Sequence, residues 1–137
     1  MKKIKTLIVD DVIVHGFRTG IEMDFANGVG TVNNSVIVNN GHFAGVAGFG
    51  VIAKRGSLTV ENSLLASNNT AVQVSTNAGL FGTVKLSNNG IYNNLTGTSC
   101  AVGVPNTQMH TAANNRKSGN TGGTNPVCDP GTAIAIE

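Results

Sequence analysis

The stretch Ser57-Leu-Thr-Val-Glu-Asn-Ser-Leu-Leu-Ala-Ser-Asn-Asn-Thr-Ala-Val-Gln-Val-Ser75 contains three short alternating runs separated by corners rich in asparagine. The apolar side chains that alternate with polar ones in these runs are Leu58, Val60, Leu65, Val72 and Val74. A period of two residues places alternate side chains on one face of a β-strand. The stretch therefore predicts three short strands joined by tight corners, which together form one coil of a solenoid.

The same pattern recurs along the whole chain. The segment Val60–Asn68 aligns without gaps with Ile8–Gly16, Val32–Asn40, Leu86–Asn94 and Ala112–Asn120. This alignment makes Asp10, Asn34, Asn62, Asn88 and Asn114 equivalent, at spacings of 24, 28, 26 and 26 residues. A repeat of this length is typical of solenoids. We predict a single domain with coils near residues 7–30, 31–56, 57–82, 83–107 and 108–128, and a capping tail over 121–137.

Stacked coils place equivalent side chains on top of one another, because each strand pairs in parallel with its equivalent about 4.8 Å away. On the second strand the predicted inward residues are Ile13, Ile37, Leu65 and Ile91. One corner is predicted to hold a ladder of side-chain amides, formed by Asn40, Asn68, Asn94 and Asn120, with Gly16 in that position in the first coil. Lys117 stands where the other coils have an inward Ile or Leu, so the core is predicted to end there.

These segments resemble the right-handed parallel β-helix repeat family, the pectate-lyase-like solenoids, whose coils often read Asn-Ser-polar-Ile-polar-Gly-Asn. The matching segments are Asn34–Asn40, Asn62–Asn68 and Asn114–Asn120. The resemblance implies an all-β fold, a right-handed parallel β-helix of about five three-strand coils, and leans towards secreted or cell-surface proteins. It leaves the activity open, because this architecture carries lyases, hydrolases, epimerases, adhesins and scaffolds.

The start of the chain does not determine the cellular compartment of the protein. Met1–Lys3 resembles the start of a signal peptide, but Asp10 and Asp11 interrupt the apolar run that follows. The first coil also has no evident cap, so we expect either that something covers it or that the chain is a piece of a longer solenoid.

Composition excludes several classes of protein. Hydrophobic residues make up 40% of the chain and aromatic residues 4%, so the core is expected to consist of Val, Ile, Leu and Ala. The net charge is +2 and the basic residues are scattered, so we expect no nucleic-acid partner. The apolar runs are far shorter than the roughly 20 residues that span a bilayer, and no membrane span is expected.

No catalytic residue, metal ligand or cofactor is predicted. A calcium ion needs several carboxylate oxygens within about 2.5 Å, yet Asp10, Asp11, Glu22 and Asp24 all lie in the first coil and Glu61 stands alone. The histidines His15, His42 and His110 come from three coils at three different offsets, which gives no shared metal geometry.

The chain also contains one inserted loop and two cysteines. The second coil is lengthened by Gly41–Gly48, which we interpret as a surface loop that exposes His42 and Phe43. Cys100 and Cys128 lie near equivalent positions of adjacent coils. They form either a buried thiol pair, which we favour, or one disulfide.

The outward side of the second strand carries an apolar stripe where the resemblance implies Thr or Ser. Its predicted members are Val12, Val14, Val36, Val38, Leu64, Ala66 and Tyr92. Such a stripe marks a protein contact, and the alternative is that these residues serve strand propensity only. We therefore expect a homodimer or another homo-oligomer.

The leading functional hypothesis is a non-enzymatic β-helix module that acts as a scaffold or interaction surface. The alternative is a carbohydrate-active enzyme, either a polysaccharide lyase or a glycoside hydrolase, or a polysaccharide-binding fragment of one. Its site would lie in the groove beside the inserted loop. An enzyme of that kind should bring carboxylates from at least two coils together.

Overall fold

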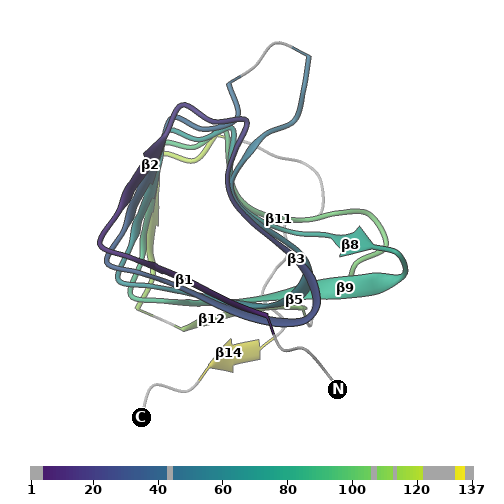
Figure 1. Ribbon diagram of the computed structural model, residues 1–137. Helices are drawn as coiled ribbons and strands as arrows, with labels where there is room; N and C mark the ends of the chain where they lie inside the picture. Colours follow the sequence, from purple (N-terminus) through teal and green to yellow (C-terminus); the bar gives the residue numbers. More distant parts are fainter. Residues whose placement is uncertain (1–4, 43–44, 106–107, 113, 122–131, 135–137) are drawn as a thin grey trace.

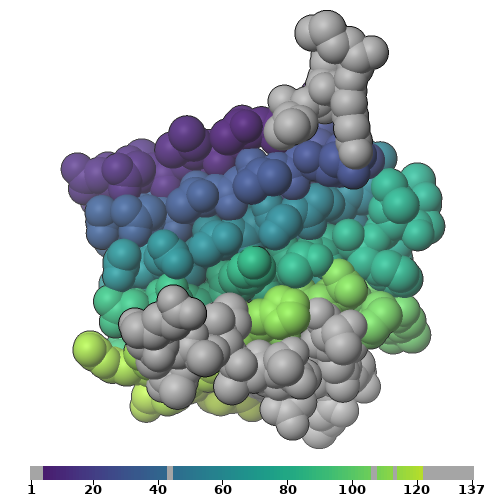
Figure 2. All heavy atoms as spheres, turned by 90° about the horizontal axis from the view of Figure 1, so that it is seen from below, coloured from purple at the N-terminus to yellow at the C-terminus, as the bar shows by residue number. Residues whose placement is uncertain are grey.

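The computed structural model describes residues 5–42, 45–105, 108–112 and 114–121, and the backbone of 132–134. The chain forms a solenoid with three sides (Figure 1). Seen from the N-terminal end it runs clockwise as it moves away from the viewer, so the solenoid is right-handed. The coils appear as successive layers in Figure 2. The fold class predicted from the sequence is confirmed.

Each side of the solenoid is a parallel sheet. The first side contains β1 (Thr6–Asp10), the second half of β3 (Thr19–Asn33), the second half of β5 (Phe49–Glu61), β9 (Leu80–Ser87), β12 (Met109–Ala112) and β14 (Thr132–Ile134). The second side contains β2 (Ile13–His15), β4 (Val36–Val38), β6 (Leu64–Ala66), β10 (Gly90–Tyr92) and β13 (Arg116–Ser118). The third side contains the first halves of β3 and β5, then β7 (Thr70–Val74) and β11 (Thr96–Cys100).

The number of turns is slightly smaller than predicted. The second side has five strands, whereas the third side has four among the described residues, so the stack makes about four complete turns. A short strand, β8 (Thr76–Asn77), pairs antiparallel with the start of β9 and forms a hairpin that projects from one corner (Figure 1). No helix in the described part of the chain is long and apolar enough to cross a membrane.

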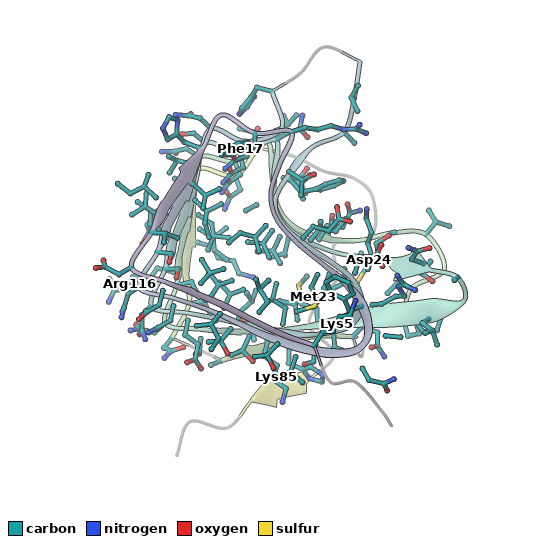
Figure 3. All side chains as sticks on the ribbon, in the orientation of Figure 1. Lys5, Phe17, Met23, Asp24, Lys85 and Arg116 are labelled. Atoms are coloured by element: carbon teal, nitrogen blue, oxygen red, sulfur yellow. The ribbon has the colours of Figure 1, made fainter. Side chains whose placement is uncertain are left out.

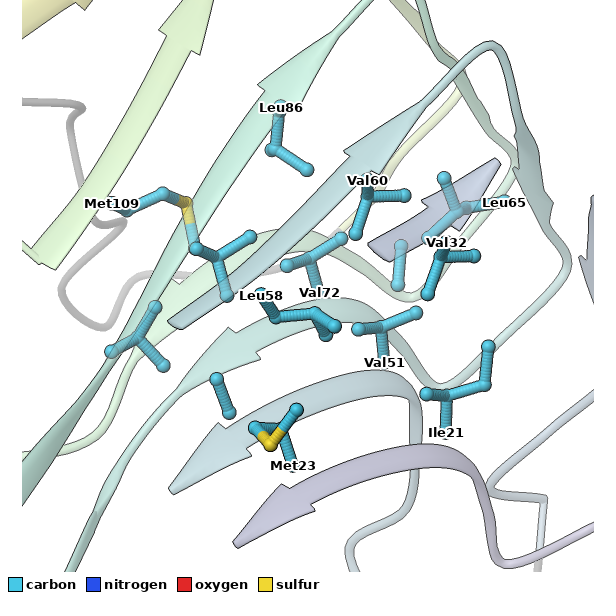
Figure 4. Close-up of a cluster of buried hydrophobic side chains, with 14 of the residues drawn as sticks. Ile21, Met23, Val32, Val51, Leu58, Val60, Leu65, Val72, Leu86 and Met109 are labelled. Atoms are coloured by element: carbon cyan, nitrogen blue, oxygen red, sulfur yellow. The ribbon is translucent and has the colours of Figure 1, made fainter. Parts of the chain in front are cut away.

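The core consists of aliphatic side chains stacked in columns (Figure 4). The five predicted inward residues of the central coil, namely Leu58, Val60, Leu65, Val72 and Val74, are all completely buried. Met23 and Met109 pack at the two ends of the same cluster. Removal of this apolar surface from water, at roughly 25 cal/mol per Å², is the main stabilising contribution.

The predicted amide ladder is present. The backbone N–H of Asn40 donates to Asn68 Oδ1 at 3.0 Å, that of Asn68 to Asn94 Oδ1 at 2.9 Å, and that of Asn94 to Asn120 Oδ1 at 3.0 Å. The same amides donate through Nδ2 to backbone carbonyls, such as Ile37 O for Asn68. Among the described residues no buried side-chain nitrogen or oxygen lacks a hydrogen-bond partner, so burial of the ladder leaves no side-chain amide unsatisfied.

The ladder depends on small residues on the strand that follows each corner. A Cβ added to Gly50 would lie 3.1 Å from Asn68 Cγ, and one added to Gly97 would lie 3.2 Å from Asn120 Cγ. These distances are shorter than ordinary van der Waals contact. Glycine at these positions therefore leaves room for the amides to stack.

A second ladder, which was not predicted from the sequence, lies at the corner between the first and second sides. The N–H of Ser35 donates to Ser63 Oγ at 3.1 Å, that of Ser63 to Asn89 Oδ1 at 3.0 Å, and that of Asn89 to Asn115 Oδ1 at 2.9 Å. Its signal is the polar residue two positions before each inward residue of the second side. Because serine and asparagine share this ladder, identity alone does not show the equivalence.

The first coil corrects the alignment by one residue. Asp10 pairs with Asn33 and not with Asn34, so Val14 lies beside Ile37 and faces the interior. The predicted inward residue of this coil, Ile13, is instead 71% exposed. The prediction that Val14 is an outward interface residue is therefore wrong.

Corner geometry explains this shift. The corner after β1 requires a positive φ, which Asp11 provides at 54°, close to the 49° of Asn34 and of Asn62. Asp and Asn tolerate this conformation better than most residues. At the ladder corner the shift places Phe17, and not Gly16, level with Asn40, and the N–H of Phe17 donates to Asn40 Oδ1 at 3.0 Å.

Near the C-terminal end, Lys117 pairs with Ile91 in register and is exposed, so the core ends where it was predicted to end. β14 adds a parallel strand to β12. The rest of the predicted capping tail beyond Thr121 lies outside the described residues. Cys100 is disulfide-bonded, which overturns the favoured thiol pair, and Cys128 lies outside the described residues.

Candidate interaction face

The outer side of the β2–β4–β6–β10–β13 sheet carries two columns of side chains. The first column consists of Ile13, Val36, Leu64, Gly90 and Arg116, and the second of His15, Val38, Ala66, Tyr92 and Ser118. Neither column contains Asp, Glu or Lys. Arg116, in the last coil, is the one arginine among these ten residues. We call the part of these columns on β2, β4, β6 and β10 the outer apolar face.

The outer apolar face is most exposed on β2 and β6. Ile13 is 71% and Leu64 37% exposed to solvent, while Val36, Val38, Ala66 and Tyr92 are half-buried by their neighbours in the columns. Val12 is exposed at the corner where β2 begins. Apart from Val14, the structure places the predicted stripe residues on or beside one outward surface, and it adds Ile13.

Tyr92 closes the gap that Gly90 would leave in the first column. A Cβ added to Gly90 would lie 2.6 Å from Tyr92 Cε2 and 3.4 Å from Leu64 Cδ1. The aromatic ring therefore lies across Gly90 and beside Leu64. As a result, the apolar surface continues from β6 to β10 without a polar interruption.

The outer side of the first sheet has a different character. Beyond β1 its outward residues are mostly hydroxyl, amide or charged groups, including Thr31, Asn33, Ser57, Thr59, Glu61, Thr83, Lys85 and Ser87. Figure 3 shows Lys85 pointing outward from this side, with Arg116 at the border of the second side. Residue type therefore distinguishes the outer apolar face from its neighbour.

The corner between the third and first sides is held by charged groups. Arg55 Nε donates to Asp24 Oδ1 at 2.6 Å, and Asn77 Nδ2 donates to Asp24 Oδ2 at 2.7 Å. Burial raises the pKa of Asp24, but the hydrogen bonds from Arg55 and Asn77 and the charges of Arg55 and Lys54 outweigh it, so the pKa lies below its ordinary value. Both carboxylate oxygens are engaged, which indicates a structural role in joining β3, β5 and β8.

A hollow of about 470 Å³ lies beside this corner, between the β3–β5 turns and the β8–β9 hairpin. Its lining includes Asn27, Val29, Ser57, Leu80, Phe81 and Thr83, and none of the described residues that line it has an ionisable side chain. The hollow lies at the β8–β9 corner, whereas the groove of the carbohydrate-active alternative was expected beside the inserted loop. The described lining of this hollow therefore contributes no carboxylate to the active site that a carbohydrate-active enzyme would require.

The inserted loop is attached to the following coil. His42 is exposed, and its Nε2 lies 2.6 Å from Ser67 O. Phe43 lies outside the described residues. Within the described part of the chain, no three residues of the His, Cys, Asp and Glu types gather closely enough to hold a metal ion.

These features define a right-handed parallel β-solenoid with two buried ladders and one apolar outer face. Comparisons with protein-family models, with curated proteins and with solved structures found no match to the chain. The resemblance to pectate-lyase-like solenoids is therefore not confirmed.

Proposed function

We propose that this chain is a non-enzymatic β-solenoid module that associates with a second copy of itself through the outer apolar face. The observation that carries this proposal is the pair of outward columns that cross four coils without Asp, Glu, Lys or Arg. The neighbouring outer side of the first sheet is polar, so strand propensity alone does not account for the difference.

The shape of this surface suits packing of one sheet on another. Two β-sheets pack face to face about 10 Å apart, and a specific interface buries roughly 800 Å² on each partner. The ring of Tyr92 provides an aromatic group with a polar edge, which is a residue type enriched at interfaces. A two-fold axis allows one self-complementary surface to cover itself.

The test compares two double substitutions that add the same charge to adjacent coils. Val36→Lys with Leu64→Lys places two cations on the outer apolar face, and Thr31→Lys with Thr59→Lys places two on the polar side of the same coils. We expect the first variant to remain folded and to have at most half the wild-type mass in light scattering, because the charges would be desolvated in the contact. The control should keep the wild-type mass.

Two results would contradict the proposal. One is a wild-type mass of 14.0 kDa at high concentration, which would leave the stripe as strand propensity on an exposed surface. The other is an equal loss of mass in the two variants, which would indicate a general effect of charge.

A further inference from the structure

β1 is the end strand of its sheet at the N-terminal end of the described solenoid. Among the described residues it pairs with β3 alone and stands at the end of its sheet. Edge strands are commonly protected by lysine, proline or a bulge. The run Thr6-Leu-Ile-Val9 contains no charge and no proline, and its pairing with β3 is continuous.

The hydrogen bonds to β3 show which backbone groups point to the open edge. Lys5 O accepts from the N–H of Val29 at 3.0 Å, and the N–H of Asp11 donates to Asn33 O at 3.2 Å. In a parallel ladder alternate residues bond to the same neighbour, so the residues bonded to β3 have odd numbers. The N–H and C=O groups that face away from β3 are those of Thr6, Ile8 and Asp10.

The same end of the molecule exposes unusual apolar surface. Ile8 is 75% exposed, although Thr31, Thr59 and Lys85 hold its position in the next three coils. Phe17 is 57% exposed where the other coils have a ladder asparagine. Leu7 and Val9 are only partly buried, because no coil lies above them in the described structure.

We propose that two copies of the chain join end to end through antiparallel pairing of β1, about a two-fold axis at Ile8. Ile8 then faces Ile8 of the second copy, and Thr6 faces Asp10. Thr6, Ile8 and Asp10 each direct their N–H and C=O groups to this edge. In this register these groups form about six hydrogen bonds between the two copies. Leu7 lies opposite Val9 of the second copy, which joins the two cores.

Charge selects the antiparallel arrangement. The cation Lys5 lies just before β1, and the carboxylates of Asp10 and Asp11 lie at its last residue and just after it. Antiparallel pairing brings Lys5 of one copy beside Asp11 of the other, whereas parallel pairing would place like charges together.

The decisive experiment is disulfide trapping in the full chain. Residues of a hydrogen-bonded antiparallel pair have Cα atoms about 5.5 Å apart, which suits a disulfide. Ile8→Cys should therefore give a covalent dimer under mild oxidation, visible on a non-reducing denaturing gel. Peptide mapping should show a bond between the two substituted positions and not to Cys100 or Cys128.

Two matched controls fix the register and the edge. In Thr6→Cys each thiol faces Asp10 of the other copy and not the other thiol. The two thiols would therefore be about 13 Å apart, the length of the four residues of strand between positions 6 and 10. In Thr31→Cys the thiol lies in the same column but one coil further from the axis. We expect both to give less than a tenth of the dimer formed by Ile8→Cys. Equal trapping by Thr6→Cys would indicate parallel pairing and overturn the proposal.

A second substitution tests the contact without a cross-link. Ile8→Lys leaves an exposed side chain in the single copy but places two cations on the axis, so we expect at least a tenfold weaker association. Thr59→Lys, in the same column of the third coil, should have no effect. Unchanged association in Ile8→Lys would overturn the proposal.

The trapping experiment also separates this inference from the proposed function. Ile8→Cys should form the covalent dimer even when Val36→Lys and Leu64→Lys have disrupted the outer apolar face. If purified Ile8→Cys forms no covalent dimer under mild oxidation, the β1 edge does not bind a second copy. This conclusion holds whether or not the outer apolar face associates. Such a result would instead favour an extended strand from another protein as its occupant.

Discussion

Adjacent asparagines perform different tasks at the ladder corner. Asn39 is exposed and takes a φ of 54°, a left-handed conformation that turns the chain. Asn40 is completely buried, and its Nδ2 donates to Asn68 Oδ1 at 3.0 Å, to Val38 O at 3.1 Å and to Val14 O at 3.2 Å. The pair Asn39-Asn40 therefore combines a backbone requirement with a side-chain requirement.

Substitution of each residue by glycine separates these two requirements. Asn39→Gly should change the free energy of unfolding by less than about 0.5 kcal/mol, because glycine adopts positive φ freely. Asn40→Gly should cost about 2–4 kcal/mol, because it leaves the N–H of Phe17 unsatisfied and removes the amide that donates to Asn68 Oδ1 and to the carbonyls of Val14 and Val38. Urea unfolding of both variants measures the difference. Equal losses would show that the ladder contributes nothing beyond the turn.

The strands differ in how far their sequence determines their orientation. In β4, β6 and β10 the inward residues Ile37, Leu65 and Ile91 were predicted correctly, because asparagine-rich corners on both sides fix the count. In β2 the run Val12-Ile13-Val14 is apolar at every position, so alternation cannot choose a face. The corner φ of Asp11 decides the register there, and the sequence offers two adjacent aspartates for that position.

The surface elements were less predictable than the coils. The β8–β9 hairpin has a recognisable signal in Asn77-Ala-Gly79, whose last two residues take positive φ, but the repeat pattern concealed it. The hollow beside it depends on Phe81 and Asn27, which are far apart in sequence. The candidate face was predictable because outward residues in β4, β6 and β10 follow directly from the inward ones.

The register of β2 can be tested with neighbouring substitutions. Val14→Asp should lower the free energy of unfolding by about 2 kcal/mol or more, because it places a carboxylate against the core beside Ile37. Ile13→Asp should leave a dilute sample nearly as stable as wild type, because that side chain is 71% exposed. Thermal unfolding followed by circular dichroism compares them. The opposite order would restore the alignment in which Ile13 faces inward.

At the scale of the whole molecule, the two proposed contacts lie on different parts of the solenoid. The outer apolar face runs along the stack, across β2, β4, β6 and β10, whereas the β1 edge lies at the N-terminal end of the stack. Each contact is two-fold and leaves the other free. Two such contacts on one chain generate assemblies larger than a dimer, either closed with a second two-fold axis or open and alternating.

The assembly state should therefore respond to the two contacts separately. Wild type at high concentration should exceed twice 14.0 kDa in sedimentation velocity, and the combination of Val36→Lys, Leu64→Lys and Ile8→Lys should sediment as a monomer. Ile8→Lys alone should leave a dimer that is insensitive to salt, because the outer apolar face carries no Asp, Glu, Lys or Arg. Val36→Lys with Leu64→Lys should leave a dimer that weakens with salt, because Lys5 and Asp11 meet across its axis. If either variant alone is already monomeric, one contact requires the other, and the molecule has a single composite interface.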